Sequence, residues 1–432
     1  MARRIERPGY RLPVAIGCPA VGSRAPPLRH RPLGISSLAR MAGMTTLERS
    51  ALLAIALLTA LAGVANYGTW SAIPRFAVAT LALAGLAWVV SFATEQLGER
   101  FGPGVTGMMQ STLGNLPELF VVIFALQKGE LVVAQTAIIG SILANALLVL
   151  GLVIVVGARR SPDRLMRFSK RLPRDTATLL QVTVFIIVLL GLSLANHDPA
   201  SHHVKAISIV GAICLLVVYL TWVVPYLRSD QAPGEAQDNA TAASALDGVS
   251  GAGEIAAAVD DGSSPGETSA VAAEPERSGP RLPLWLTITL LIGGGAASAF
   301  VSEWFVNGLE PAISILHISQ AFAGLVIVAI AGNAVENTAG LVLAYKRRSD
   351  LAISVVKNSV AQIAAFLFPV LVLVSFALNT TLTFALAPVY IGALALTALG
   401  LWQVTGDGEA AEFEGWALVA LYVILATLTL YE

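Results

Sequence analysis

Two short polar strings lie inside apolar stretches of this chain, and each of them carries a glutamate. The first string is Gly114-Asn115-Leu116-Pro117-Glu118, and the second, 218 residues later, is Gly332-Asn333-Ala334-Val335-Glu336. A carboxylate at membrane depth is energetically costly and usually has a function. Two of them in matching contexts indicate one cation site that is built from two halves of a duplicated protein.

Glycine and proline in these strings favour local breaks in the helices that carry them. Glycine weakens a helix interior, and Pro117 has no backbone N–H to donate. We expect the freed carbonyls to face a cavity rather than lipid. Carbonyl, carboxylate, hydroxyl and amide oxygens suit a hard metal ion such as calcium, which takes about 6–8 of them. Glu118 and Glu336 could neutralise one divalent ion or each accept a proton, and competition of that kind is sufficient for antiport. The alternative is that they are structural carboxylates paired inside a helix bundle.

Further oxygen donors lie in the next apolar stretch of each half. They are Gln135 and Ser141 in the first half, and Ser359 and Gln362 in the second. Ser359 and Gln362 are three residues apart, so they share one face of a helix. Asn115 and Asn333 are candidates to hold the broken helices in register through bonds to the backbone. Alternatively, the serines permit close helix packing and the glutamines bond neighbouring helices.

The composition places the protein in a membrane. The chain has 432 residues, of which 56% are hydrophobic and 13% are charged, and its mean hydropathy is +0.73. A soluble domain carries about 25% charged residues. The net charge of −1 points to no particular partner, and no basic patch with interleaved aromatics suggests nucleic acid. Cys18 and Cys214 lack metal-ligand spacing, and we expect no permanently bound cofactor.

About eleven apolar stretches are long enough to span a bilayer, which requires about 20 residues each. They lie near 48–67, 72–97, 104–127, 131–156, 175–195, 204–227, 284–306, 319–345, 350–377, 382–402 and 413–431. We therefore predict an all-α integral membrane protein with one helix followed by two five-helix repeats. The predicted parts are a basic tail over 1–46, a first helix and loop over 47–71, repeats over 72–228 and 283–432, and a disordered acidic loop over 229–282.

Positive charge in the short loops predicts the orientation. Basic residues gather in two of these loops, at 159–174 and 346–348. They lie inside if the first helix enters from the cytoplasm, as do the N-terminus and the 229–282 loop. The C-terminus then lies outside, in a multi-pass protein of a bacterial plasma membrane. The two polar strings fall on the third and eighth helices, and an odd separation predicts repeats that run through the membrane in opposite senses.

The first 40-odd residues are rich in arginine and proline and contain no apolar run of membrane length. One interpretation is a disordered basic tail on the cytoplasmic side. The other, which we favour, is a wrongly assigned start, because Met41 or Met44 would begin a membrane protein directly. A cleaved signal peptide fits poorly, since no apolar core follows the arginines.

Several strings together resemble the cation/proton exchangers of the CAX type. In the first half these are Thr94-Glu95-Gln96-Leu97, the Gly114–Glu118 string, Gln135 and Gly140-Ser141-Ile142-Leu143-Ala144-Asn145. In the second half they are Ser302-Glu303, the Gly332–Glu336 string, Asp350-Leu351-Ala352, Ser359 and Gln362. The resemblance implies Ca²⁺/H⁺ antiport, ten core helices and a dispensable first helix, with Glu118 and Glu336 as ion ligands. It also implies that Glu95 and Glu303 lie on mobile gating helices; the alternative is that these two are glutamates at helix ends.

The sequence departs from that family at several positions. Asn337 stands where a histidine is common, and Asn358-Ser359-Val360 stands where Gly-Ser-Ser is usual. Lys357 lies about 12 Å into its predicted helix. It could pair with Glu118 or Glu336 and favour a monovalent ion, or it could extend to the inner surface. Exchange of Na⁺ or K⁺ for H⁺, or of Na⁺ for Ca²⁺, therefore stays open as the alternative to Ca²⁺/H⁺ exchange.

Other classes of protein fit the sequence less well. We find neither a nucleophile with a base nor a His-Glu-x-x-His string, so a membrane hydrolase is disfavoured. The sequence also contains no P-loop, which disfavours ATP-driven pumping by this chain alone. A channel is not excluded by sequence, although paired carboxylates in inverted repeats favour alternating access. The oligomeric state stays open.

Overall fold

The computed structural model describes residues 44–98, 100, 113–169, 171–228 and 281–432, with side chains described at all of these except 171–174 and 225–228. All of them belong to one compact unit, Ala42–Glu432. Apart from two short strands, the regular secondary structure of the described residues is helical, which confirms the all-α prediction in its main feature. The predicted tail and acidic loop lie almost wholly outside the described residues.

The helices alternate with short turns, as apolar stretches of membrane length require. In the first half they are α1 (Thr46–Tyr67), α2 (Ala72–Gly98), α4 (Leu116–Gln127), α5 (Leu131–Leu143), the π-helix η2 (Ala144–Val149), α6 (Leu150–Arg159), α7 (Arg171–Ala195), the 3₁₀-helix η3 (Pro199–His203) and α8 (Val204–Arg228). In the second half they are α10 (Leu284–Leu316), α11 (Gln320–Phe322), η5 (Ala323–Val328), α12 (Ala329–Gly332), α13 (Ala334–Tyr345), α14 (Ser349–Gln362), η6 (Ile363–Leu367), α15 (Phe368–Ser375), α16 (Pro388–Thr405) and α17 (Glu412–Leu430).

Among the described residues, nine helices are long and apolar enough to span a membrane, or ten if the bent pair around Asn333 is one span. The predicted helix over 104–127 runs into 101–112, outside the described residues, and only its second half is seen as α4. The predicted number of eleven therefore stays a prediction. Two predicted boundaries were wrong. The helix from 284 continues to Leu316 because Leu309 and Ala312 are buried in the core, and the helix predicted from 382 begins at Pro388.

The duplication inferred from the two strings is repeated in the helix boundaries. Helices α4 and α13 each have 12 residues and begin 218 positions apart, and α5 and α14 begin with the same offset. A π-helical segment follows each of the latter two, at Ala144 and at Ile363. The turn before each also contains a positive φ at matching positions, 85° at Gly129 and 60° at Arg347.

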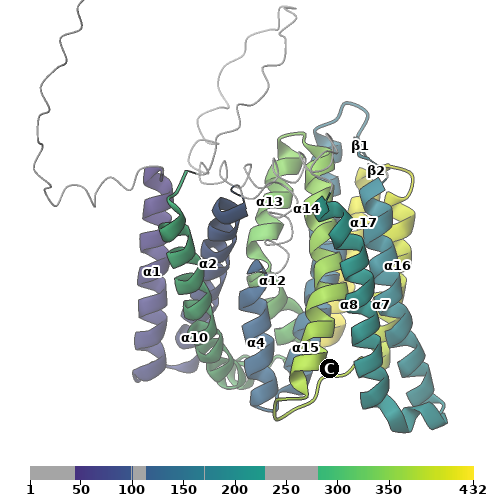
Figure 1. Cartoon of the computed structure of the whole chain (residues 1–432), viewed down its shortest axis with the longest axis horizontal. Helices are drawn as coiled ribbons and strands as arrows, with labels where there is room; N and C mark the ends of the chain where they lie inside the picture. The colour runs from purple at the N-terminus through teal and green to yellow at the C-terminus, as the bar shows by residue number, and fades with distance from the viewer. Residues whose placement is uncertain (1–43, 99, 101–112, 170, 229–280) are drawn as a thin grey trace, which may run out of the picture. The chain divides into compact units, whose positions relative to one another are not determined.

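The two repeats run in opposite directions. Helices α4 and α13 begin near each other, because a Cβ placed on Gly332 would lie 3.7 Å from the Cβ of Glu118. Their last residues lie at opposite ends of the protein. At the end of α4, the Gln127 carbonyl accepts a hydrogen bond from Asn379, in the segment after α15. At the end of α13, the Tyr345 carbonyl accepts one from Arg160, which follows α6. Figure 1 shows α4 below α13, the segment after α15 at the lower end and the strands at the upper end. This is the predicted inverted arrangement.

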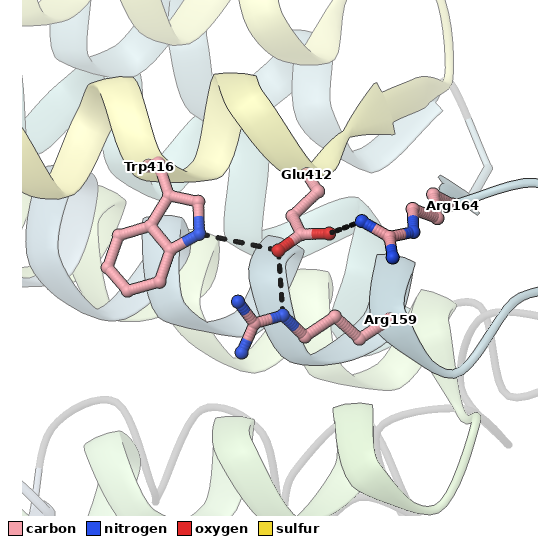
Figure 2. Close-up of polar contacts among 4 residues, drawn as sticks. All are labelled: Arg159, Arg164, Glu412 and Trp416. Carbon is pink, nitrogen blue, oxygen red and sulfur yellow. Dashed lines mark hydrogen bonds and ion pairs between the residues drawn. The ribbon is translucent and has the colours of Figure 1, made fainter.

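A small sheet, which the sequence did not predict, joins the halves at one end. Strand β1 (Leu165–Arg167) pairs antiparallel with β2 (Glu409–Ala411). Beside it, the Glu412 carboxylate accepts hydrogen bonds from Arg159 at 2.7 Å and from Arg164 at 3.3 Å (Figure 2). The loops after α6 and after α16 therefore lie at the same end of the helices. Which side of the membrane this is stays a prediction.

Close backbone packing brings the centres of the two repeats together, and it can be tested with glycine substitutions. A Cβ on Gly140 would lie 2.5 Å from the backbone of Leu325, whereas one on Gly293 would meet nothing within 4 Å. Gly140→Ala should therefore cost about 1–3 kcal/mol through overpacking. Gly293→Ala should be neutral or stabilising by up to about 1 kcal/mol, because alanine favours a helix over glycine. Thermal unfolding of the two purified variants measures this difference, and equal melting temperatures would contradict the packing described.

Candidate functional site

Each string glutamate lies in the first turn of a half-helix. Glu118 is the third residue of α4, and Glu336 is the third residue of α13. The preceding asparagines have non-helical backbones, with φ −89° and ψ 12° at Asn115 and φ −102° and ψ 20° at Asn333. At the second string the helix bends by 62°, which confirms the predicted break. Unpaired N–H groups at a helix N-terminus favour negative charge, so both carboxylates stand where the backbone helps to hold an anion.

The two strings meet at the centre of the fold. A Cβ placed on Gly332 would lie 3.7 Å from the Cβ of Glu118, so the Glu118 side chain lies next to Gly332. Glu118 also lies within electrostatic range of Ser141 and Glu336. The two carboxylates differ in environment: Glu118 is 1% exposed, whereas Glu336 is partly exposed. One of these two carboxylates is therefore enclosed, and the other is less completely covered by protein.

Beside the carboxylates, amides and hydroxyls from both repeats form one buried cluster. The Asn333 amide donates to the Ser141 hydroxyl at 2.9 Å, and it also donates to the Ala329 carbonyl. The Asn145 amide donates to Asn333 Oδ1 at 3.2 Å and to Ser359 Oγ at 3.1 Å. These bonds tie α5, η2 and α14 to the break between α12 and α13. The bond to the Ala329 carbonyl is a bond to backbone of the kind expected of Asn333, and the role of this residue in holding the broken helix in register stays a prediction.

Asn145 was not selected as a site residue from the sequence. It stands four residues after Ser141, on the same helical face, so helical spacing was a signal that could have found it. Comparing the two halves at the 218-residue offset did not reveal Asn145, because the matching position in the second half is Ile363. Asn145 therefore has no matching asparagine in the second half, and it bonds Asn333 and Ser359 of that half directly.

The site has more buried acceptors than donors. Among the described residues, Asn145 Oδ1 and both carboxylate oxygens of Glu118 have no partner at hydrogen-bond distance, although the Ser141 hydroxyl lies close to the carboxylate. A buried acceptor without a donor is costly. A cation or a proton would satisfy these oxygens, so the donor set fits a cargo of that kind.

Hard oxygen ligands, rather than nitrogen or sulfur, make up this set. In the part of the chain that the structure describes, no group of three or more His, Cys, Asp or Glu residues could hold a metal ion. Two carboxylates with amide, hydroxyl and carbonyl oxygens suit calcium better than zinc or copper.

Helix α10 contacts the first string directly. The Ser302 hydroxyl donates to the Pro117 carbonyl at 3.3 Å, one residue before Glu118. The predicted gating residues differ: Glu95 on α2 is 2% exposed, whereas Glu303, next to Ser302, is exposed.

Some predicted site residues lie outside the cluster. The Gln135 amide donates to the Ala385 carbonyl, in the segment before α16. Gln362 is the last residue of α14, is partly exposed and takes no part in the four bonds of the cluster. Gly114 and Asn115 are buried at the start of α4.

Lys357 is held by α16. Its ammonium donates to the hydroxyl of Thr405, in the last turn of that helix, where the partial negative charge of the helix end favours a cation. The side chain is 0% exposed, so the predicted extension to the inner surface is wrong. No ion pair among the described residues joins it to either string glutamate.

Replacing an asparagine of the buried cluster should lower the stability of the protein more than replacing an exposed asparagine. Asn333→Ala removes an amide that donates two hydrogen bonds and accepts one, at a fully buried position, so we expect a loss of about 1–3 kcal/mol. Asn196→Ala is the matched control, because Asn196 is exposed and bonds only the local carbonyl of Leu192. Thermal unfolding in detergent should show a clearly lower melting temperature for the first variant alone. Similar values for both would mean that the cluster contributes little.

Comparison with known proteins identifies what this arrangement resembles. The profile of a family described as "Sodium/calcium exchanger protein" matches residues 71–226 and 286–431. A Ca²⁺/H⁺ antiporter of Synechocystis sp. is 30% identical over 366 residues, covering 84% of this chain and 92% of that protein. One of Aphanothece halophytica is 27% identical over 357 residues, covering 82% and 90%.

Solved structures share the fold. The native structure of YfkE superposes with a TM-score of 0.67 at 23% identity, covering 88% of this chain and 100% of that one. The crystal structure of an H⁺/Ca²⁺ exchanger, CAX, gives 0.64 at 15% identity, covering 89% and 93%.

Proposed function

The chain belongs to the sodium/calcium exchanger protein family, and we propose that it is a secondary antiporter that exchanges Ca²⁺ for H⁺ across a membrane. The relatives that are 27–30% identical over more than four-fifths of this chain carry the name Ca²⁺/H⁺ antiporter. The observation that carries the proposal is the meeting of Glu118 with the Gly332 backbone at the junction of two inverted half-helices. An oxygen-rich, partly enclosed site of this kind suits a divalent cation.

In this proposal Glu118 and Glu336 are shared between the ion and protons. When Ca²⁺ is bound, the two carboxylates neutralise it, and buried amide and hydroxyl oxygens supply the remaining ligands. When Ca²⁺ has left, protons neutralise the carboxylates, because two negative charges close together in an apolar environment are unfavourable. Ion and protons then cannot occupy the site together, which couples their movements in opposite directions.

Alternating access would arise from the inverted repeats. Helices α2 and α10 carry Glu95 and Glu303, and α10 contacts the Pro117 carbonyl beside the site. A shift of these two helices relative to the α4–α6 and α12–α15 elements would change which end of the site is open. We propose that the basic end is cytoplasmic, with the C-terminus outside.

Neutralising either string glutamate tests the site. Glu118→Gln and Glu336→Gln should each lower Ca²⁺ uptake by about tenfold or more, because the number of charged ligands sets calcium affinity over decades. Glu310→Gln is the matched control, since Glu310 is exposed near the end of α10. The measurement is ⁴⁵Ca²⁺ uptake by purified protein in proteoliposomes under a pH gradient. If the gradient drives no uptake, or if Glu118→Gln leaves it unchanged, the proposal is lost.

The alternative is exchange of Na⁺ or K⁺, and it rests on Lys357, two residues from Ser359 on α14. The bond to Thr405 directs this ammonium toward α16 and so favours Ca²⁺. Lys357→Met should accordingly change the ratio of Ca²⁺ to Na⁺ uptake by less than about twofold. A tenfold change, which corresponds to about 1.4 kcal/mol, would be needed for a change of preferred ion. A large shift toward Ca²⁺ in this variant would instead show that the ammonium replaces a monovalent charge at the site.

A further inference from the structure

Four exposed cations gather at the end of the helices where the strands lie. They are Arg160, after α6, and Lys346, Arg347 and Arg348, in the turn between α13 and α14. We call them the turn cluster. The Arg160 guanidinium donates to the Tyr345 carbonyl at 3.3 Å, and its carbon lies 4.2 Å from the centre of the Tyr345 ring. Contacts across two elements therefore hold Arg160 next to the other three.

The turn cluster carries charge that no ion pair with the described residues neutralises. Nearby arginines are paired: Arg159 and Arg164 with Glu412 (Figure 2), and Arg167 with Asp163 and Glu409. Over the described ranges, no ion pair involves the four cluster residues. The neighbouring Asp350 accepts a bond from the backbone N–H of Ser169.

The duplicated chain provides an internal comparison for this turn. The matching turn of the first repeat is Lys128-Gly129-Glu130, with no net charge, whereas Lys346-Arg347-Arg348 carries three positive charges. Both turns place their central residue in the left-handed region, which glycine adopts freely and arginine does not. An arginine at such a position indicates that its side chain contributes something that offsets the strain.

The backbone of the turn is not available to a ligand. The N–H groups of Lys346, Arg347 and Arg348 donate to the carbonyls of Val342, Ala344 and Leu343, which close the end of α13. An anion at this turn would therefore bind to its side chains rather than to these three N–H groups. Guanidinium and ammonium groups provide the donors that a phosphate oxygen accepts.

The location of the turn cluster relative to the apolar spans indicates which kind of anion it would meet. The apolar spans end at Arg159 and at Tyr345, and the next one begins at Ser349, so the cluster lies just beyond the apolar core. Tyr345 and Trp416 lie among these arginines and are exposed, as aromatic residues at a membrane interface are. Phosphate groups are concentrated at this depth in the headgroups of phospholipids.

We propose that the turn cluster binds the phosphate of an anionic phospholipid. The lipid bridges the end of α6 and the turn that follows α13. Because α13 carries Glu336 in its first turn, the bound headgroup fixes the opposite end of the half-helix that supplies a site residue. This proposal concerns lipid binding alone and stands whether or not the transported ion is Ca²⁺.

The experiment measures lipid binding to the purified full-length chain in detergent by native mass spectrometry. Phosphatidylglycerol should bind about tenfold or more tightly than phosphatidylcholine, since each basic residue near anionic lipid adds attraction. The triple variant K346Q/R347G/R348Q and the single variant R160Q should weaken binding of phosphatidylglycerol and leave phosphatidylcholine unaffected. The control R164Q/R167Q removes two cations that are already paired and should retain the preference.

Three results would overturn the proposal. They are equal binding of the two lipids by the unmodified chain, unchanged phosphatidylglycerol binding by both cluster variants, and displacement of the lipid by an equal concentration of inorganic phosphate. The last would identify a site for a soluble anion. Should the triple variant fail to fold, R160Q and R347G serve alone, since glycine is the residue that the matching turn of the first repeat contains at this position.

Discussion

The placement of two carboxylates, one buried and one partly exposed, at the centre of an apolar protein is the constraint on which the rest of this structure depends. Glu118 is almost wholly enclosed, and the helix that carries Glu336 is bent by 62° to bring its N-terminus to the same place. In a continuous helix, the N–H groups donate to carbonyls of the same helix, so none would be free to stabilise a buried carboxylate. Interrupting each helix provides an N-terminus at membrane depth, and inverting the second repeat makes the two N-termini converge.

Convergence requires the helices to approach closely, and small residues permit this. The backbone of Leu325 occupies the space where a side chain on Gly140 would lie, and Thr136 occupies that space for Gly324. The contact places Ser141 where the Asn333 amide reaches it. Packing and polar bonding are therefore one arrangement here: without the glycines, the hydroxyl and the amide would be too far apart to bond.

The sequence predicted the features that repeat and missed those that depend on a single contact. The offset of 218 residues predicted the pairing of strings, the inverted repeats and the break at Asn333, because each follows from local composition or helix parity. The strands have three residues each, too few for an alternating pattern to be visible. The bond between Lys357 and Thr405 depends on how two helices are rotated about their axes, which an apolar stretch does not specify. The boundary at Pro388 was missed for a related reason: the apolar residues before it, such as Leu382 and Phe384, are buried without being helical.

The positions at which the two halves differ follow from the geometry of an inverted repeat in an asymmetric membrane. A residue close to the axis that relates the halves can serve both, so one copy is sufficient. Asn145 bonds Asn333 and Ser359 of the other half, and its counterpart Ile363 is apolar. A residue far from the axis meets one side of the membrane in the first repeat and the other side in the second. Gly129 and Arg347 share a backbone conformation but face opposite ends of the helices, and only the second carries a charge. The positions that match between the halves therefore carry the two glutamate strings, whereas those that differ lie in the buried polar cluster, as Asn145 does, and at the ends of the helices, as Arg347 does.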